Sequence, residues 1–193
     1  MATSVSSVTI ANRALQRLSA TAISALSQTI PNAQNCNTAY DPLRRMLLRR
    51  YPWSFAIARA SVAMDSNQTA WGNHNRYLLP NDFIRLIRPG GQDTDSRTDW
   101  RIEGQYIITN DGSPLQFRYI FDNTDPTTFD PLFCEALSCL MAHEICLAVT
   151  GSQERKQGLA ADLKDIIAQA KKADSFERDA QEPLLDDWII AMY

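Results

Sequence analysis

The apolar residues change their spacing twice along the chain, and this change limits the folds that the chain can adopt. Over residues 7–50 and 130–180 they recur every three to four residues, which is typical of helices. Between residues 53 and 121 they alternate with polar residues, which is typical of strands. A strand segment between two helical segments predicts an α+β fold, a four-helix bundle with an inserted small antiparallel β module.

Four helices are predicted, over residues 7–18, 32–50, 131–149 and 152–180, and an ordered loop that ends at Pro31 is predicted between the first two. The predicted inner residues of the second helix recur every three to four positions: Ala33, Cys36, Tyr40, Leu43 and Leu47. Asp130 followed by Pro131 is typical of a helix start, and Gly151 is typical of a helix end. Pro42 lies inside the second helix, where it removes one backbone donor. We therefore expect a kink or a break near residues 39–41.

The β module is predicted to begin immediately after the second helix. Trp53 and Phe55 start the first predicted strand, and we expect them to anchor the β module against the helices. Tyr40 of the second helix is a further predicted structural anchor. The segment 110–114, Asn-Asp-Gly-Ser-Pro, predicts a hairpin turn, and the polar run 90–96 predicts a loop. The further predicted strands lie around Tyr77–Leu79, Phe83–Ile87, Ile102–Ile108 and Phe117–Phe121.

These patterns divide the chain into three parts. Residues 1–52 and 130–182 form the predicted helical domain, 53–129 the inserted β module, and 183–193 a C-terminal docking tail. The tail follows a helix whose apolar face is already used, and it carries large apolar residues. We expect it to dock on another chain through Trp188, Ile189, Ile190 and Tyr193.

The chain contains little that catalysis requires. It has two histidines among 193 residues, and no phosphate-binding loop, dinucleotide fingerprint or nucleophile elbow occurs. His143-Glu144 starts a string similar to a zinc protease motif, but Leu147 stands where the second histidine is required. We predict that the protein is not an enzyme and holds no cofactor.

One thiol-rich helical face leaves an alternative open. Cys139, His143 and Cys146 lie at helical spacing and could offer two thiolates and an imidazole to a metal. A structural zinc site needs a fourth ligand, and Cys134 lies on another face. The sequence therefore favours buried thiols and predicts no metal, with a thiol- or metal-dependent enzyme as the weaker alternative.

The sequence predicts a soluble, reduced, intracellular protein. No apolar segment follows a basic start, so no secretory signal is expected. The most apolar stretch, 132–149, is interrupted by Glu135, His143 and Glu144, which are costly in lipid, so no membrane span is expected. Four unevenly spaced cysteines do not resemble a disulfide framework.

The formal net charge is −3, but the charges are unevenly placed. The first 64 residues contain seven arginines and one acidic residue, Asp41, whereas the rest of the chain is acidic. The first third is therefore expected to face an acidic partner or a polyanion. Four of its arginines are the interface candidates, Arg44, Arg45, Arg49 and Arg50. We expect them to contact other chains; the alternatives are a solvated helix face and a nucleic-acid-binding module that uses residues 44–59.

Several segments resemble a known family. The most specific are AQNCNTAYDPLRRMLL at 33–48 and YPWSFAIARA at 51–60, in which Cys36, Tyr40 and Trp53 stand out. Weaker similarity covers 77–85, 133–152 and 170–183. Together they resemble tail tubular protein A, the head-to-tail adaptor of short-tailed bacteriophages and prophages. The sequence departs from that pattern at Leu18-Ser19, where Leu-Gly is usual, and at 27–31, where an acidic loop is usual.

The resemblance implies a structural virion protein without catalysis. Such adaptors form a ring of identical subunits, usually a dodecamer, between the portal protein and the tail nozzle, tubular protein B. The implied location is the head-tail interface of the virion, after synthesis in the bacterial cytoplasm. DNA is then a partner as the genome that the ring helps to retain and pass, and no membrane partner is implied.

Overall fold

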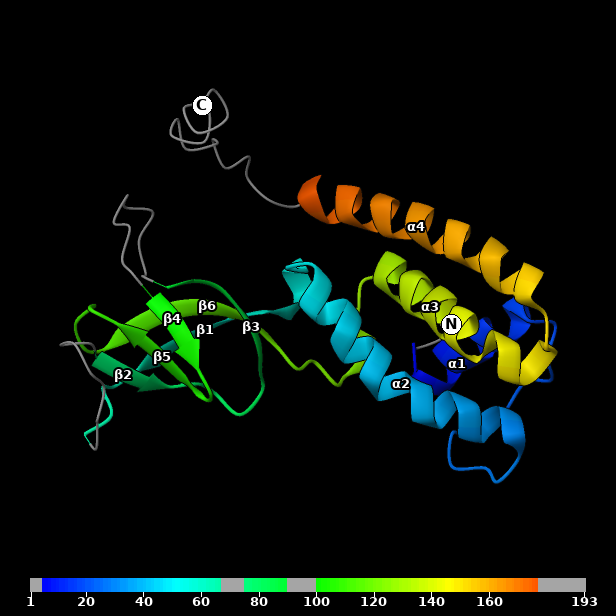
Figure 1. The fold of residues 1–193 in the computed structure, drawn as a ribbon, viewed down its shortest axis with the longest axis horizontal. Coiled ribbons are helices and arrows are strands. Elements are labelled where there is room, and N and C mark those ends of the chain that lie inside the picture. The colour runs from blue at the N-terminus through cyan, green and yellow to red at the C-terminus, as the bar shows by residue number, and fades with distance from the viewer. Residues whose placement is uncertain (1–4, 67–74, 90–99, 177–193) are drawn as a thin grey trace.

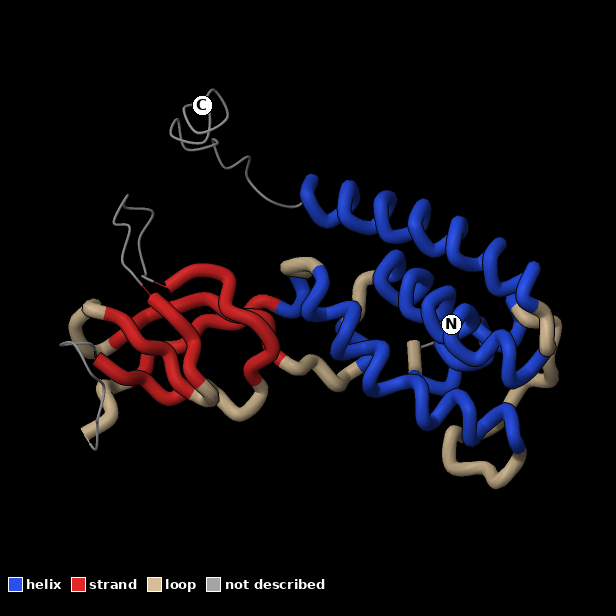
Figure 2. The backbone as a smooth tube through the Cα atoms, viewed as in Figure 1, coloured by secondary structure: helices blue, strands red, loops and turns tan. Residues whose placement is uncertain are grey.

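The computed structural model describes residues 5–66, 75–89 and 100–176. It has an α+β fold, with four helices and two small antiparallel sheets in the described residues. The helices occupy one end of an elongated molecule and the strands occupy the other (Figure 2). The chain leaves the helices after α2, forms both sheets, and returns to the helices at α3 (Figure 1).

The helices pack around α3. The four are α1 (Ser7–Arg17), α2 (Pro31–Arg50), α3 (Pro131–Thr150) and α4 (Gln153–Phe176). Helix α3 contacts each of the other three, so it is the most buried of them. Asp130 caps it as predicted, because its carboxylate accepts from the backbone N–H groups of Leu132 and Phe133. Gly151 ends it with a left-handed φ of 66°.

Helix α2 continues through Pro42. Of the kink or break predicted near residues 39–41, the break is therefore wrong, whereas the axis of α2 does change direction along its course in Figure 1. Pro31, which the sequence places at the end of a loop, is the first residue of the helix, where its missing N–H costs nothing. The predicted buried face of this helix is confirmed, since the inner residues Ala33, Cys36 and Leu47 are all buried.

Each sheet has three antiparallel strands. Sheet A has the order β1–β6–β3 and sheet B has the order β2–β5–β4. The strands are β1 (Ile57–Val62), β2 (Asn75–Leu78), β3 (Phe83–Pro89), β4 (Trp100–Glu103), β5 (Tyr106–Thr109) and β6 (Leu115–Phe121). A small core of Tyr77, Leu79, Leu86, Ile107, Leu115, Phe117 and Tyr119 lies between them.

The first strand begins later than predicted. Residues Ser54–Ala56 form a 3₁₀ turn, and β1 starts at Ile57. Two hydrogen bonds hold this connection against the helices: Trp53 Nε1 donates to the Leu47 carbonyl at 3.0 Å, and Ser54 N donates to the Asp174 carboxylate at 2.7 Å. The indole therefore belongs to the helical core, although alternation suggested a strand.

The predicted hairpin at 110–114 is also wrong. The strands on its two sides, β5 and β6, lie in different sheets, so this segment carries the chain from sheet B to sheet A. The hairpin of the described chain lies at Gly104-Gln105, where Glu103 pairs with Tyr106 and Gly104 has a φ of +59°. Glycine fits this two-residue turn because it adopts positive φ without steric cost. The predicted loop 90–96 lies outside the described residues.

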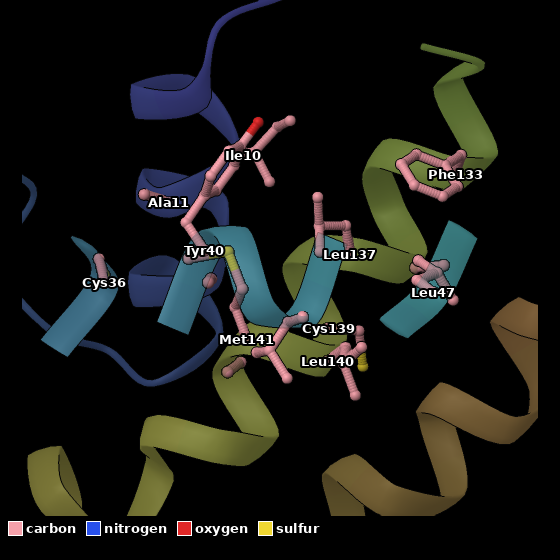
Figure 3. Close-up of a cluster of buried hydrophobic side chains, with 14 of the residues drawn as sticks. Ile10, Ala11, Cys36, Tyr40, Leu47, Phe133, Leu137, Cys139, Leu140 and Met141 are labelled. Carbon is pink, nitrogen blue, oxygen red and sulfur yellow. The ribbon is translucent and has the colours of Figure 1, made fainter. Parts of the chain in front are cut away.

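A large apolar cluster fills the helical end. It joins buried residues of α1, α2 and α3, among them Ile10, Tyr40 and Leu137 (Figure 3). Ile84 of β3 and Ile120 of β6 belong to the same cluster, so the end of the outer face of sheet A that carries them packs against the helical core. The two ends are therefore joined by apolar contacts as well as by the chain connections.

Candidate interaction surfaces

Arg44 does not lie on the surface where the sequence placed it. The residue is 2% exposed, and its guanidinium contacts the Asp122 carboxylate at 2.6 Å and the Asn123 carbonyl. Asp41, one turn earlier, adds a carboxylate at 3.3 Å. The expectation that Arg44 meets another chain is therefore wrong. The carboxylate that neutralises Arg44 belongs to Asp122, in the segment after β6, and local sequence patterns do not predict a contact across 78 residues.

Arg45 and Arg49 are exposed but engaged. Arg45 Nε lies 3.3 Å from the second oxygen of Asp122, with 59% of its side chain exposed. Arg49 Nη1 donates to the Ile84 carbonyl at 2.5 Å and so ties α2 to β3. The charged side of α2 therefore serves first to hold the sheets. Helix α2 ends at Arg50, so residues 44–59, which the nucleic-acid alternative uses, do not form one helix.

Arg50 borders a groove beside α4. The groove has a volume of about 340 Å³ and is open to solvent. Leu163 and Ile167 supply an apolar floor, while Arg50, Lys164 and Lys171 supply positive charge. The ammonium of Lys171 also lies over the Tyr51 ring, 5.4 Å from its centroid. This groove, called the α4 groove below, suits an apolar segment that carries carboxylates.

Two of the predicted anchors, Tyr40 and Trp53, are buried in the helical core, and the third, Phe55, is partly buried against it. Trp53 is 1% exposed, and its ring contacts Phe133 edge-on at 5.2 Å between centroids. Phe55 packs on Phe133 at 4.9 Å. Tyr40 is 7% exposed, its Oη has no hydrogen-bond partner in the described chain, and burial raises its pKa to about 12.

The thiol-rich face of α3 is part of the core. Cys139 and Cys146 are fully buried, and Cys139 Sγ lies 3.7 Å from the Leu159 carbonyl. Burial raises the pKa of Cys36 and Cys134 to about 11, which disfavours the reactive thiolate. Within the described ranges no three His, Cys, Asp or Glu residues are placed to hold a metal ion.

Helix α3 is long and apolar enough to cross a membrane. It packs against α1, α2 and α4, however, and more than half of its apolar stretch is buried inside the protein. A central core helix accounts for this composition.

Sequence reasoning missed a group of arginines on sheet A. Arg85 of β3 and Arg118 of β6 are partly buried, and Arg59 of β1 is exposed. Their signal was present, because each is a charged residue within a segment that the sequence predicts as a strand. The register that brings strands distant in sequence together was not readable from the sequence.

The predicted tail residues Trp188, Ile189, Ile190 and Tyr193 lie outside the described residues. Searches against protein-family models and against curated proteins found no match to this chain.

Proposed function

We propose that the protein is a head-to-tail adaptor of a short-tailed bacteriophage or prophage, related to tail tubular protein A. In this function it forms a ring between the portal protein and the tail nozzle, a dodecamer as is usual in the resembled family. Its helices act as a four-helix bundle, its strands as an inserted module, and it has no catalytic role. The finished ring belongs to the virion.

The backbone at Ser19 is the observation that carries this proposal. Ser19 has a φ of 56°, a left-handed conformation that favours glycine. Its N–H bonds the Gln16 carbonyl and the Ala20 N–H bonds the Leu15 carbonyl, both at 3.0 Å, which is a Schellman ending for α1. The resembled family usually has glycine here. Although this sequence has serine where the family usually has glycine, the backbone at Ser19 keeps the left-handed conformation that favours glycine.

The residues that carry the resemblance also have a common structural role. Cys36, Tyr40 and Trp53 are buried between the helices, and Phe55 packs on the same cluster. The matching segments therefore correspond to the part of the fold that connects the helical core to β1. This supports a shared fold better than scattered surface similarity would.

A closed ring of identical subunits needs two different complementary surfaces on each subunit. The α4 groove offers one, with an apolar floor and a basic border. The tail 183–193 offers chemistry to match, since it combines Trp188, Ile189 and Ile190 with two aspartates. In the proposed ring the tail of one subunit binds the α4 groove of the next or, as the sequence also allowed, the portal.

The direct test measures particle mass with and without the portal protein of the same phage. We expect the 21.7 kDa chain to form a species of about 260 kDa on its own, or to add about 260 kDa to the mass of the portal protein assembly. Mass photometry of the full chain gives this value directly. A protein that stays monomeric and never associates with portal contradicts the proposal.

Two defective variants locate the subunit contact. One lacks residues 183–193; the other reverses the groove charge by Arg50→Glu with Lys164→Glu. Neither should form rings, and both should retain the melting temperature of the full chain. Mixed together they should form heterodimers, because one supplies an intact groove and the other an intact tail. Ring formation by the truncated chain refutes the tail contact, and absence of heterodimers refutes its pairing with the groove.

A further inference from the structure

The strands of sheet A carry an unbalanced positive charge. They contain no aspartate or glutamate but four arginines: Arg59 in β1, Arg85 and Arg88 in β3, and Arg118 in β6. A sheet of this size normally mixes both signs, because like charges on neighbouring strands repel. This composition therefore requires a reason beyond folding.

The register aligns three of these arginines across the sheet. Arg59 pairs directly with Arg118, and on the other side Arg118 pairs with Arg88. Ala58 and Ala60 pack into the β core, so Arg59 projects from the opposite, outer face. Side chains directly opposite in an antiparallel pair start about 5 Å apart, so Arg59 and Arg118 are neighbours on one face of the sheet.

Sheet B shows how the same residue type is treated elsewhere in the β module. Arg76 pairs with Asp65 at 2.6 Å, and Arg101 pairs with Glu103 at 2.5 Å. For Arg59 and Arg118 the described chain provides no carboxylate partner. The strands of sheet B thus hold two arginines, each paired with a carboxylate, whereas those of sheet A hold four.

A second pair extends the positive surface toward the helices. Arg85 is partly buried. Its burial and, as the smaller cause, the nearby positive charge of Arg49 both lower its pKa. It pairs in register with Ile120, two residues along β6 from Arg118. Arg49 is held there by its bond to the Ile84 carbonyl. Four guanidinium groups thus follow one side of sheet A from α2 to the Arg59–Arg118 pair.

We propose that the outer face of sheet A, in the part beyond Ile84 and Ile120 that carries Arg59 and Arg118, binds the phosphate backbone of nucleic acid without reading its sequence. Arginine forks match phosphate oxygens, and a row of them matches a repeating anion better than it matches a single carboxylate. The next pair along the strands is Ser61 and Gln116, both exposed and polar. None of the exposed large apolar residues of the described chain lies in a strand of sheet A, whereas a protein partner would need such anchors.

The test uses fluorescence anisotropy of a labelled random-sequence DNA duplex with the full chain over a salt series. The site variant is Arg59→Gln with Arg118→Gln. We expect it to lose about 10-fold in affinity at low salt and to lower the slope of log affinity against log salt by about 2. Arg59→Lys with Arg118→Lys retains both charges and should keep most of the slope.

A matched control removes two positive charges elsewhere, by Arg101→Gln with Lys172→Gln, and should change affinity less than about 2-fold. The site variant should melt at the same temperature as the native chain or higher, since it relieves a repulsion. No duplex binding by the native chain, or equal loss in site and control variants, overturns the proposal. Loss of binding to polyglutamate or to phosphatidylserine vesicles in the site variant, with duplex binding unchanged, overturns it as well. Ring formation is measured separately, so failure of the adaptor proposal is distinguishable.

Discussion

The helical end and the β end of this protein use their charges differently. Among the helices Glu135 pairs with Arg13 and Arg17, and Arg44 is enclosed by carboxylates. In the β end sheet B pairs its arginines, but sheet A leaves Arg59 and Arg118 without acid in the described chain. The difference indicates that the helices are built chiefly for stability, whereas one sheet sacrifices some stability to present positive charge.

The two ends also differ in the size of their cores. The helical cluster includes an aromatic group around Phe133, while the β core has seven buried side chains. Because buried apolar area is the main source of stability, most of the unfolding free energy should come from the helical end. Five substitutions test this division, starting with the largest expected effect.

Trp53→Ala should lower the free energy of unfolding by about 3–5 kcal/mol. It removes a fully buried indole together with its hydrogen bond to the Leu47 carbonyl. Trp100→Ala is the control, since Trp100 is 44% exposed on a strand of sheet B and should cost far less. Urea unfolding followed by circular dichroism measures both, and similar losses would contradict the division.

Asp122→Asn should cost about 2–3 kcal/mol. The Arg44 charge would remain buried without its carboxylate at 2.6 Å, at the junction between α2 and the strands. Glu103→Gln, in an exposed pair with Arg101, should cost about 0.5 kcal/mol or less. Chemical denaturation gives both values, and hydrogen exchange should locate the Asp122→Asn effect at the junction. A loss as small as that of the control would show that this ion pair does not hold the ends together.

Ser19→Gly should raise the stability by about 1 kcal/mol, because glycine adopts the left-handed φ of 56° without steric cost. Gly151→Ser, at a φ of 66° after α3, should lower it by a similar amount. Thermal melting should therefore shift in opposite directions for the two variants. A shift in the same direction would contradict the assigned helix endings.

Tyr77→Phe should cost about 1 kcal/mol, with its effect confined to the strands. The Tyr77 hydroxyl donates to the Asp111 carbonyl at 2.7 Å, and the ring is fully buried in the β core. Hydrogen exchange should rise in β2 and β5 and stay unchanged in α3. Equal acceleration in both regions would mean that the two ends unfold as one unit.

Glu135→Gln should cost about 1 kcal/mol or less at neutral pH. Burial raises the pKa of this carboxyl, but its ion pairs with Arg13 and Arg17 outweigh burial and lower it below the ordinary 4.5. The stability that these ion pairs contribute is therefore present above pH 4.5, and it is lost as the pH falls through the lower pKa of the folded state. Native and variant melting temperatures should differ at pH 7 and converge as the pH falls below the folded pKa of Glu135.

Local patterns in the sequence were sufficient for the helices and for much of their core. The spacing of Cys36, Tyr40 and Leu47 identified the buried face of α2, because a helix sets the neighbours of a residue within a few positions. Asp130 and Gly151 marked the ends of α3 for the same reason: capping involves residues a few positions apart.

Pairings between distant segments were decided by the tertiary structure. Asp122 neutralises Arg44 across 78 residues, and the segment 110–114 connects two sheets although its composition is typical of a hairpin. Arg59 and Arg118 become neighbours through the β1–β6 register. The physical reason is the same in each case: local preferences determine the conformation of a segment, but the segments that meet are chosen by burial of their apolar faces over the whole chain.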